Sequence, residues 1–333
     1  MGSETPLRVP IVDFSGENLT PGSHAWAATR AQLWAALDSY GCFEAVYGGL
    51  TPELRDATFA ASEQLFALPL EAKLRNASDK PYHGYVGQIS DLPYESLAVD
   101  DALSPAAPRD FTHLMWPQGN PRFCETICEF AGRAADLDRT IRRGVLESMG
   151  VEDYCDAHME STKYVLRFSE YGVPGAGEAA RLTLQPHVDG NLCTLIYQNQ
   201  VHGLEVQARS GDWVPVAPSS PSSFVFVAGD ALRAWSNDRV FSPPHRVRVA
   251  GRETRYCVML FAVPLDETVI EAPAELVREG RPRLFKPYRY PDYVKYSSWA
   301  SWQAAGADLT SILPDFCGTA AKPQQPEIPI SPQ

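Results

Sequence analysis

The sequence lacks the features of a protein that spans a membrane or binds a polyanion. The longest apolar run, residues 257–265, contains a proline and is far shorter than the roughly 18 residues that a membrane span needs. Lys and Arg number 29 against 41 Asp and Glu, which gives a net charge of −12, whereas nucleic acid and anionic lipid attract clustered basic residues. We therefore expect neither a nucleic-acid partner nor a membrane partner.

Targeting and cross-linking signals are also missing. The N-terminus has no basic segment followed by an apolar core, and Pro6 stands where a myristoylation motif has Ser or Thr. The seven cysteines form no disulfide framework, which is typical of free thiols in a reducing compartment. The sequence thus predicts a cytoplasmic protein, and it carries no signal for an oligomeric state.

The apolar periodicity of the chain changes once along its length. Up to about residue 160 it is mostly helical, with helices expected over 24–40, from Pro52 to before Pro69, and from Pro121 to before Gly150. Short strands are expected at 9–14 and 42–46. Residues 76–118 carry few periodic signals and predict long loops, which often line a site.

From about residue 161 the pattern becomes strand-like. Turn signals separate eight candidate strands, at 162–168, 183–187, 192–198, 203–208, 213–217, 222–228, 245–250 and 254–263. Because helices do not alternate with these strands, a parallel doubly wound sheet is excluded, and a double-sheet jelly roll or a barrel is favoured. We predict a mainly β fold with helices, in which the N-terminal helical region packs on one sheet.

Three residues of the strand-rich half have the types and spacing of a facial metal triad. His187 and Asp189 lie at a strand end, where alternate side chains point the same way, and His245 begins another strand. Two imidazoles and one carboxylate leave half of an iron ion's coordination sphere open for a bidentate cosubstrate and O₂. The His-x-Asp pair alone is common by chance, so a hydrogen-bonded strand histidine remains an equal alternative at this point.

Arg255 lies on the apolar strand 254–263. An arginine that points into a core is costly unless a carboxylate pairs with it, and no acidic residue of this strand can do so. A bound dicarboxylate would supply the missing charge, with Tyr171 donating its hydroxyl to the same ligand. The alternative is that Arg255 is an exposed strand residue.

These residues together resemble the plant-type 2-oxoglutarate- and Fe(II)-dependent dioxygenases. The similarity extends from the N-terminal strand to about residue 316, and it is strongest to the branch that acts on glucosinolate side chains and steroidal alkaloids. The strings that carry it include Val9-Pro10-Ile11-Val12-Asp13, Gly41-Cys42-Phe43, His202-Gly203-Leu204-Glu205-Val206, Gly229-Asp230-Ala231-Leu232 and Pro244-His245-Arg246-Val247.

The resemblance implies a double-stranded β-helix core and an oxidative reaction. In such an enzyme His187, Asp189 and His245 bind Fe(II), and 2-oxoglutarate is held by Arg255, Tyr171 and Cys257. With O₂ as oxidant and ascorbate as reductant, 2-oxoglutarate gives succinate and CO₂ while a C–H bond of a small molecule is oxidised. Hydroxylation, demethylation, desaturation and ring closure all stay open.

Three other kinds of protein remain alternatives. One is a homologue that binds iron or 2-oxoglutarate without turnover. Another is a non-redox metal enzyme on a cupin-like fold, such as a zinc hydrolase, which has no use for Arg255. The third is an oxidase with a different reductant.

Two positions depart from the family pattern. The usual Arg-x-Ser reads Arg255-Tyr256-Cys257, and the usual Asn-x-Tyr reads Ser169-Glu170-Tyr171. Because a thiol is a weak hydrogen-bond donor, Cys257 should hold the cosubstrate carboxylate less firmly than a serine.

The expected substrate residues are aromatic, and they predict a small, largely apolar specialised metabolite. They are Phe261 on the strand of Arg255, Phe111 in the long loops, and Trp299 near the C-terminus. The alternative is that all three are core residues, and we favour the site for Phe261. We divide the chain into a helix-rich region (1–160), the jelly-roll core (161–265), a C-terminal segment that covers the site (266–318) and a disordered Pro-rich tail (319–333).

Overall fold

Two β-sheets face each other in the computed structural model, which describes residues 7–16, 19–81, 83–87, 93–175, 179–303 and 312–319. The larger sheet has the strand order β1-β2-β9-β6-β11-β4-β3 and the smaller has the order β5-β10-β7-β8. A cluster of buried apolar side chains from both sheets fills the space between them. The eight strands expected from the sequence are β4 to β11, which confirms the jelly roll.

The strand bounds are as follows. The larger sheet consists of β1 (Ile11–Asp13), β2 (Cys42–Val46), β3 (Tyr94–Val99), β4 (Thr162–Tyr171), β6 (Cys193–Gln198), β9 (Ser223–Ala228) and β11 (Arg255–Pro264). The smaller sheet consists of β5 (Ala180–His187), β7 (Leu204–Gln207), β8 (Trp213–Pro215) and β10 (His245–Ala250). A short third pair is β12 (Val269–Ile270) with β13 (Tyr288–Arg289).

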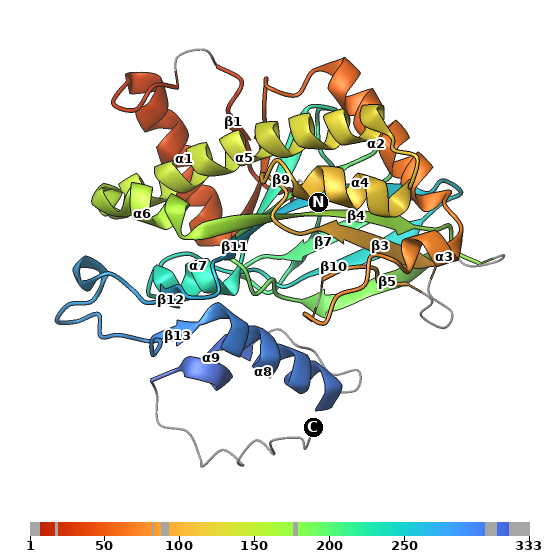
Figure 1. Ribbon diagram of the computed structural model, residues 1–333. Helices are drawn as coiled ribbons and strands as arrows, with labels where there is room; N and C mark the ends of the chain where they lie inside the picture. The colour runs from red at the N-terminus through yellow and green to blue at the C-terminus, as the bar shows by residue number, and fades with distance from the viewer. Residues whose placement is uncertain are drawn as a thin grey trace.

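Helices cover the outer face of the larger sheet (Figure 1). They are α1 (His24–Tyr40), α2 (Pro52–Phe66), α3 (Leu70–Lys73), α4 (Ala107–Met115), α5 (Pro121–Met149) and α6 (Cys155–Glu160). The expected helix boundaries are present: the side chain of Asn120 accepts a hydrogen bond from the backbone N–H of Phe123, and Gly150 ends α5 in the left-handed conformation at φ 73°.

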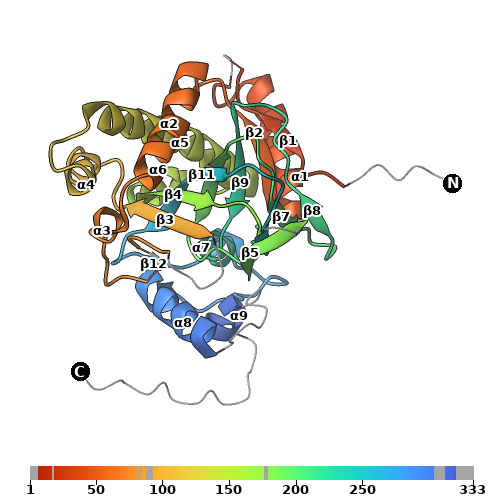
Figure 2. The same cartoon turned by 90° about the vertical axis from the view of Figure 1, so that its right-hand side faces the viewer.

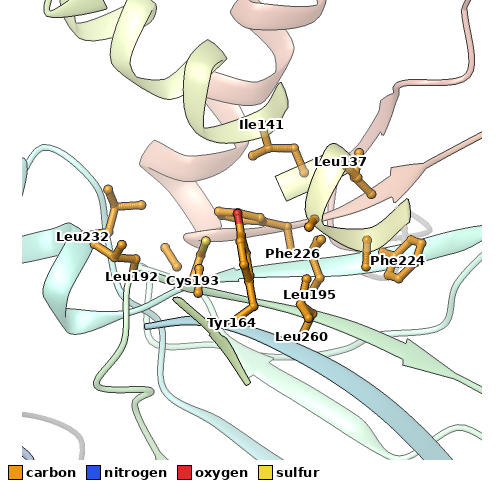
Figure 3. Close-up of a cluster of buried hydrophobic side chains, with 14 of the residues drawn as sticks. Leu137, Ile141, Tyr164, Leu192, Cys193, Leu195, Phe224, Phe226, Leu232 and Leu260 are labelled. Atoms are coloured by element: carbon orange, nitrogen blue, oxygen red, sulfur yellow. The ribbon is translucent and has the colours of Figure 1, made fainter. Parts of the chain in front are cut away.

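The long helix α5 packs its apolar stripe onto the sheet. Figure 3 shows Leu137 and Ile141 of this helix against side chains that rise from the strands, among them Leu195, Phe226 and Leu260. Because neighbouring residues of a strand point to opposite faces, the residues on either side of Leu260 in β11 point away from the helices and into the space between the sheets.

The prediction of loops for residues 76–118 is wrong in part, since this stretch contains β3 and α4. Strand β3 pairs with β4 over its full length, and the pairing of Ser96 with Ser169 shows why its pattern is weak. Its inward side chains are small or polar, so apolar and polar residues alternate only weakly along the sequence of β3. Pairing with the neighbouring strand therefore determines its conformation. In α4, Pro108 in the first turn and the buried pair Phe111 and Met115, four residues apart, were the available helix signals.

The C-terminal segment lies on the other side of the sheets from α1, α2 and α5 (Figures 1 and 2). It contains α8 (Tyr290–Gln303) and α9 (Ile312–Cys317), while α7 (Asp230–Trp235) follows β9. The expected Pro-rich tail lies outside the described residues from 320 onward. Within the described ranges, no helix has both the length and the apolar character needed to cross a membrane.

Candidate active site

The smaller sheet brings together the three residues that the sequence analysis proposed as metal ligands. His187 ends β5 and pairs with His245, the first residue of the antiparallel neighbour β10. Asp189 follows in the turn after β5, and its Oδ1 lies 3.6 Å from the Nε2 atom of each histidine. The potential ligand atoms all lie within 4.8 Å of one another, and no other such group of three occurs in the described part of the chain.

Hydrogen bonds turn these side chains toward a common point. The Nδ1 atoms of His187 and His245 lie 2.9 and 3.3 Å from backbone carbonyls two residues earlier. Since a carbonyl only accepts, each Nδ1 carries the proton and each Nε2 is left as a lone-pair donor to a metal. Thr194 donates its hydroxyl to Asp189 Oδ2 over 2.5 Å, which leaves Oδ1 facing the imidazoles.

The electrostatics of the site suit metal binding. Burial, followed by the proximity of His187, lowers the pKa of His245 to about 4, so this imidazole is neutral at neutral pH. A neutral imidazole is the form that coordinates a metal ion. Two neutral nitrogens and one carboxylate oxygen make up the donor set that non-haem Fe(II) oxygenases use.

The second part of the site is a buried cation on the inner face of the larger sheet. Arg255 is 1% exposed, which excludes the alternative of an exposed strand arginine. Its Nη2 donates to Gln198 Oε1 over 2.7 Å, and the guanidinium lies 4.8 Å from the ring centre of Tyr171. Among the described residues, its Nε and Nη1 have no hydrogen-bond partner. A buried guanidinium with unmatched donors fits an anionic ligand.

Cys257 and Tyr171 lie next to this arginine. Tyr171 pairs with Arg255 in the sheet register, and Cys257 is two residues further along β11, on the same face. Burial raises the pKa of the Cys257 thiol and, more strongly, that of the Tyr171 hydroxyl, although the nearby guanidinium opposes both shifts. Both groups are therefore uncharged, and each can donate a hydrogen bond to an anion.

Comparison with known proteins agrees with this chemistry. Residues 162–264 match the model of the 2OG-Fe(II) oxygenase superfamily, and residues 9–108 match the model described as non-haem dioxygenase in morphine synthesis N-terminal. The probable 2-oxoglutarate-dependent dioxygenase AOP1.2 of Arabidopsis thaliana is 42% identical over 295 residues, which cover 87% of this chain and 91% of that protein. The chain belongs to the 2-oxoglutarate-dependent dioxygenases.

Solved structures of dioxygenases have the same fold as this chain. The rice dioxygenase for auxin oxidation has a TM-score of 0.78 at 28% identity and covers 93% of this chain and 100% of its own. The Arabidopsis thaliana dioxygenase for auxin oxidation, solved with 2-oxoglutarate, has a TM-score of 0.74 at 26% identity, covering 83% of this chain and 100% of its own. As a member of the family, the dioxygenase uses Fe(II), 2-oxoglutarate and O₂.

The three aromatic residues expected at the substrate lie in different places. Phe261 is on the inner face of β11, half-buried, and pairs with Thr194, which holds Asp189. Phe111 does not lie with it: α4 carries this ring to the helix side of the larger sheet, where it packs against Phe123. Phe111 is thus a core residue, because the segment is a helix and not a loop at the mouth of the site.

Trp299 is exposed on α8, where it contacts the ring of Tyr296. No contact described in the structure links this indole to the metal-binding residues, so we assign it no role.

Two features of the site escaped the sequence analysis. Thr194 and Gln198 are polar residues in the otherwise apolar strand β6, and this contrast in the sequence could have indicated that they belong to the site. The other feature is Tyr293 of α8, whose hydroxyl donates to the buried carboxylate of Asp230 over 2.6 Å. The backbone N–H of Asp230 in turn donates to the carbonyl of Asp189 over 2.8 Å. Nothing in the sequence reveals this link, because it joins distant segments.

We predict that Tyr293→Phe loosens the attachment of α8 and weakens metal binding severalfold. The lost hydrogen bond to Asp230 is of the kind that contributes about 1.5–3 kcal/mol when the acceptor is charged. The position of Tyr293 matters to the metal ligand because its ring packs on the turn that carries Asp189: a Cβ added at Gly190 would lie 2.7 Å from Tyr293 Cε1. Hydrogen exchange of the α8 amides and an Fe(II) titration measure the two effects. Tyr296→Phe, on the same helix, is the matched control, and equal behaviour of both variants would contradict the prediction.

Proposed function

We propose that the dioxygenase oxidises a C–H bond of a small, largely apolar specialised metabolite that packs against Phe261. This proposal depends on one observation: an aromatic ring is left half-buried on the inner face, in register with Thr194, the residue that orients Asp189. A partly open aromatic surface beside polar site groups is typical of a pocket for an apolar ligand. The rings of Phe261 and Tyr290 also pack against a small apolar cluster formed by Ala98, Val165 and Val263.

Each group of residues has a separate task in this proposal. His187, Asp189 and His245 would hold Fe(II), because their potential ligand atoms lie close together. Arg255 and Tyr171, with Cys257, would hold 2-oxoglutarate by its distal carboxylate. Bound iron and 2-oxoglutarate supply the oxidising chemistry, while the protein positions the substrate and excludes water.

We propose that the segment 266–318 covers the site. Its helix α8 contributes Tyr290, which packs against the same small apolar cluster as Phe261, and Tyr293, which packs on the turn of Asp189. Figure 2 shows α8 and α9 lying along one side of the two sheets. A cover that packs beside the proposed substrate wall and on the turn that carries a metal ligand would shield the reaction from solvent.

We also propose a cytoplasmic location and a partner set limited to small molecules. All seven cysteines are free thiols, as expected in a reducing compartment. The net charge of −12 favours neither nucleic acid nor an anionic membrane surface as a partner.

Phe261→Ala tests the substrate proposal. We expect a loss of turnover of at least about tenfold on the metabolite that the wild-type enzyme transforms, since burying a phenylalanine ring against an apolar partner contributes about 1.5–3 kcal/mol and about 1.4 kcal/mol corresponds to a factor of ten. Iron content and 2-oxoglutarate affinity should stay as in the wild type. The metabolite is first found by incubating the enzyme with Fe(II), 2-oxoglutarate, ascorbate and metabolite extracts and recording mass changes.

Phe59→Ala is the matched control for this experiment. Phe59 is also half-buried, but it stacks on Tyr197 on the helix side, with ring centres 5.2 Å apart. Its truncation should lower the melting temperature and spare the kinetics of the folded fraction. If Phe261→Ala behaves in that same way, Phe261 is a core residue and the substrate does not contact it.

A further inference from the structure

Gln198 places an unpartnered amide group next to Arg255. It ends β6, is 6% exposed, and accepts a hydrogen bond from Arg255 Nη2 through its Oε1. A guanidinium only donates, so the amide atom that faces it must be the oxygen, and the NH₂ group must point elsewhere. Within the described part of the chain, Gln198 Nε2 has no hydrogen-bond partner.

Three buried donor atoms are thus unmatched in one place, namely Nε and Nη1 of Arg255 and Nε2 of Gln198. Leaving a buried donor unsatisfied costs about 1–3 kcal/mol, so such a group is expected to have a partner when its ligand is bound. A carboxylate can accept several hydrogen bonds, more than the guanidinium alone supplies.

The sheet register shows why a further donor is needed. Gln198 pairs with Cys257, and Cys257 pairs with Ser169 on its other side. These last two positions carry a serine and an asparagine in the family pattern described above, whereas here one is a weakly donating thiol. The hydroxyl of Ser169 lies 3.4 Å from that of Tyr94, which gives it a nearby partner of its own.

We propose that Gln198 is a 2-oxoglutarate-binding residue whose Nε2 donates to the distal carboxylate and replaces the donor that is lost at Cys257. Its Oε1 at the same time fixes the orientation of the Arg255 guanidinium. One side chain therefore positions the cation and adds to the anion's hydrogen bonds.

The test measures 2-oxoglutarate binding to the Fe(II)-loaded enzyme by calorimetry, without oxygen or primary substrate. Its outcome therefore does not depend on the class of substrate proposed above. Gln198→Leu, which keeps the size and removes both hydrogen bonds, should raise the Kd roughly 10–100-fold with iron content unchanged. Gln198→Glu should raise it more, because its carboxylate would pair with Arg255 and repel the ligand. Gln207→Leu, on β7 and hydrogen-bonded to the Gly211 carbonyl, is the matched control and should bind as the wild type does.

Cys257→Ser tests whether Gln198 donates a hydrogen bond to 2-oxoglutarate or only orients the Arg255 guanidinium. A hydroxyl donates better than a thiol, so Cys257→Ser should tighten 2-oxoglutarate binding in the wild type and recover much of the loss in Gln198→Leu. Pyruvate, which lacks the distal carboxylate, should bind equally to all these variants. The proposal is overturned by an unchanged Kd in Gln198→Leu, by a loss that Cys257→Ser does not recover, or by weaker binding in the Cys257→Ser single variant.

Discussion

His245→Ala is expected to abolish turnover while the protein keeps its fold. His245 is one of three side chains that converge within 4.8 Å, and its Nε2 faces Asp189 Oδ1 at 3.6 Å. Removing even an outer partner of a metal ligand costs about 10–100-fold in metal affinity or activity, so losing a ligand itself should cost more than about a hundredfold. Iron content per protein and 2-oxoglutarate-dependent succinate formation measure the loss, and circular dichroism reports the fold.

The control for this variant is His202→Ala. His202 is exposed in the connection between β6 and β7, so its truncation should leave iron content and turnover unchanged. A His245→Ala protein that retains iron and near-normal succinate formation would remove His245 from the metal site.

The sequence predicted the parts of this fold that depend on local pattern. Apolar alternation between turn residues predicts the strands β4 to β11. An apolar stripe between Asn120 and Gly150 predicts α5. The metal-binding group could also be predicted, because the spacing of His187 and Asp189 and a second histidine at the start of another strand are visible in the sequence. Asp189 itself lies beyond the end of β5, and the hydrogen bond from Thr194 helps to orient its carboxylate.

The remainder depends on which strands become neighbours, and single-sequence patterns do not contain that information. Strand β3 exists because β4 pairs with it, and Gln198 reaches Arg255 because β6 and β11 are adjacent in one register. Phe111 was a candidate substrate contact with a core role as the alternative, and its ring is buried beside Phe123, as is usual for a large aromatic side chain.

Arg255→Ala is expected to raise the Kd and KM for 2-oxoglutarate by two to three orders of magnitude. A charge left without its buried partner typically costs about 3–5 kcal/mol, which corresponds to a factor of at least a hundred in affinity. The guanidinium is 1% exposed and keeps two donor atoms unmatched among the described residues, so a bound carboxylate would lose its main partner. Iron binding should be retained, because the metal-binding residues make no hydrogen bond or ion pair to Arg255 in the described structure.

Arg255→Lys and Arg248→Ala complete this experiment. Lysine keeps the charge but loses the planar set of donors, so it should recover only part of the affinity, since one ammonium cannot serve both Gln198 Oε1 and a carboxylate in the same geometry. Arg248 is exposed on β10, and its truncation should leave the Kd unchanged. Calorimetry with 2-oxoglutarate and with pyruvate distinguishes the ends of the ligand: the loss should appear for the dicarboxylate alone. An Arg255→Ala enzyme that binds 2-oxoglutarate as tightly as the wild type would show that another cation holds the distal carboxylate.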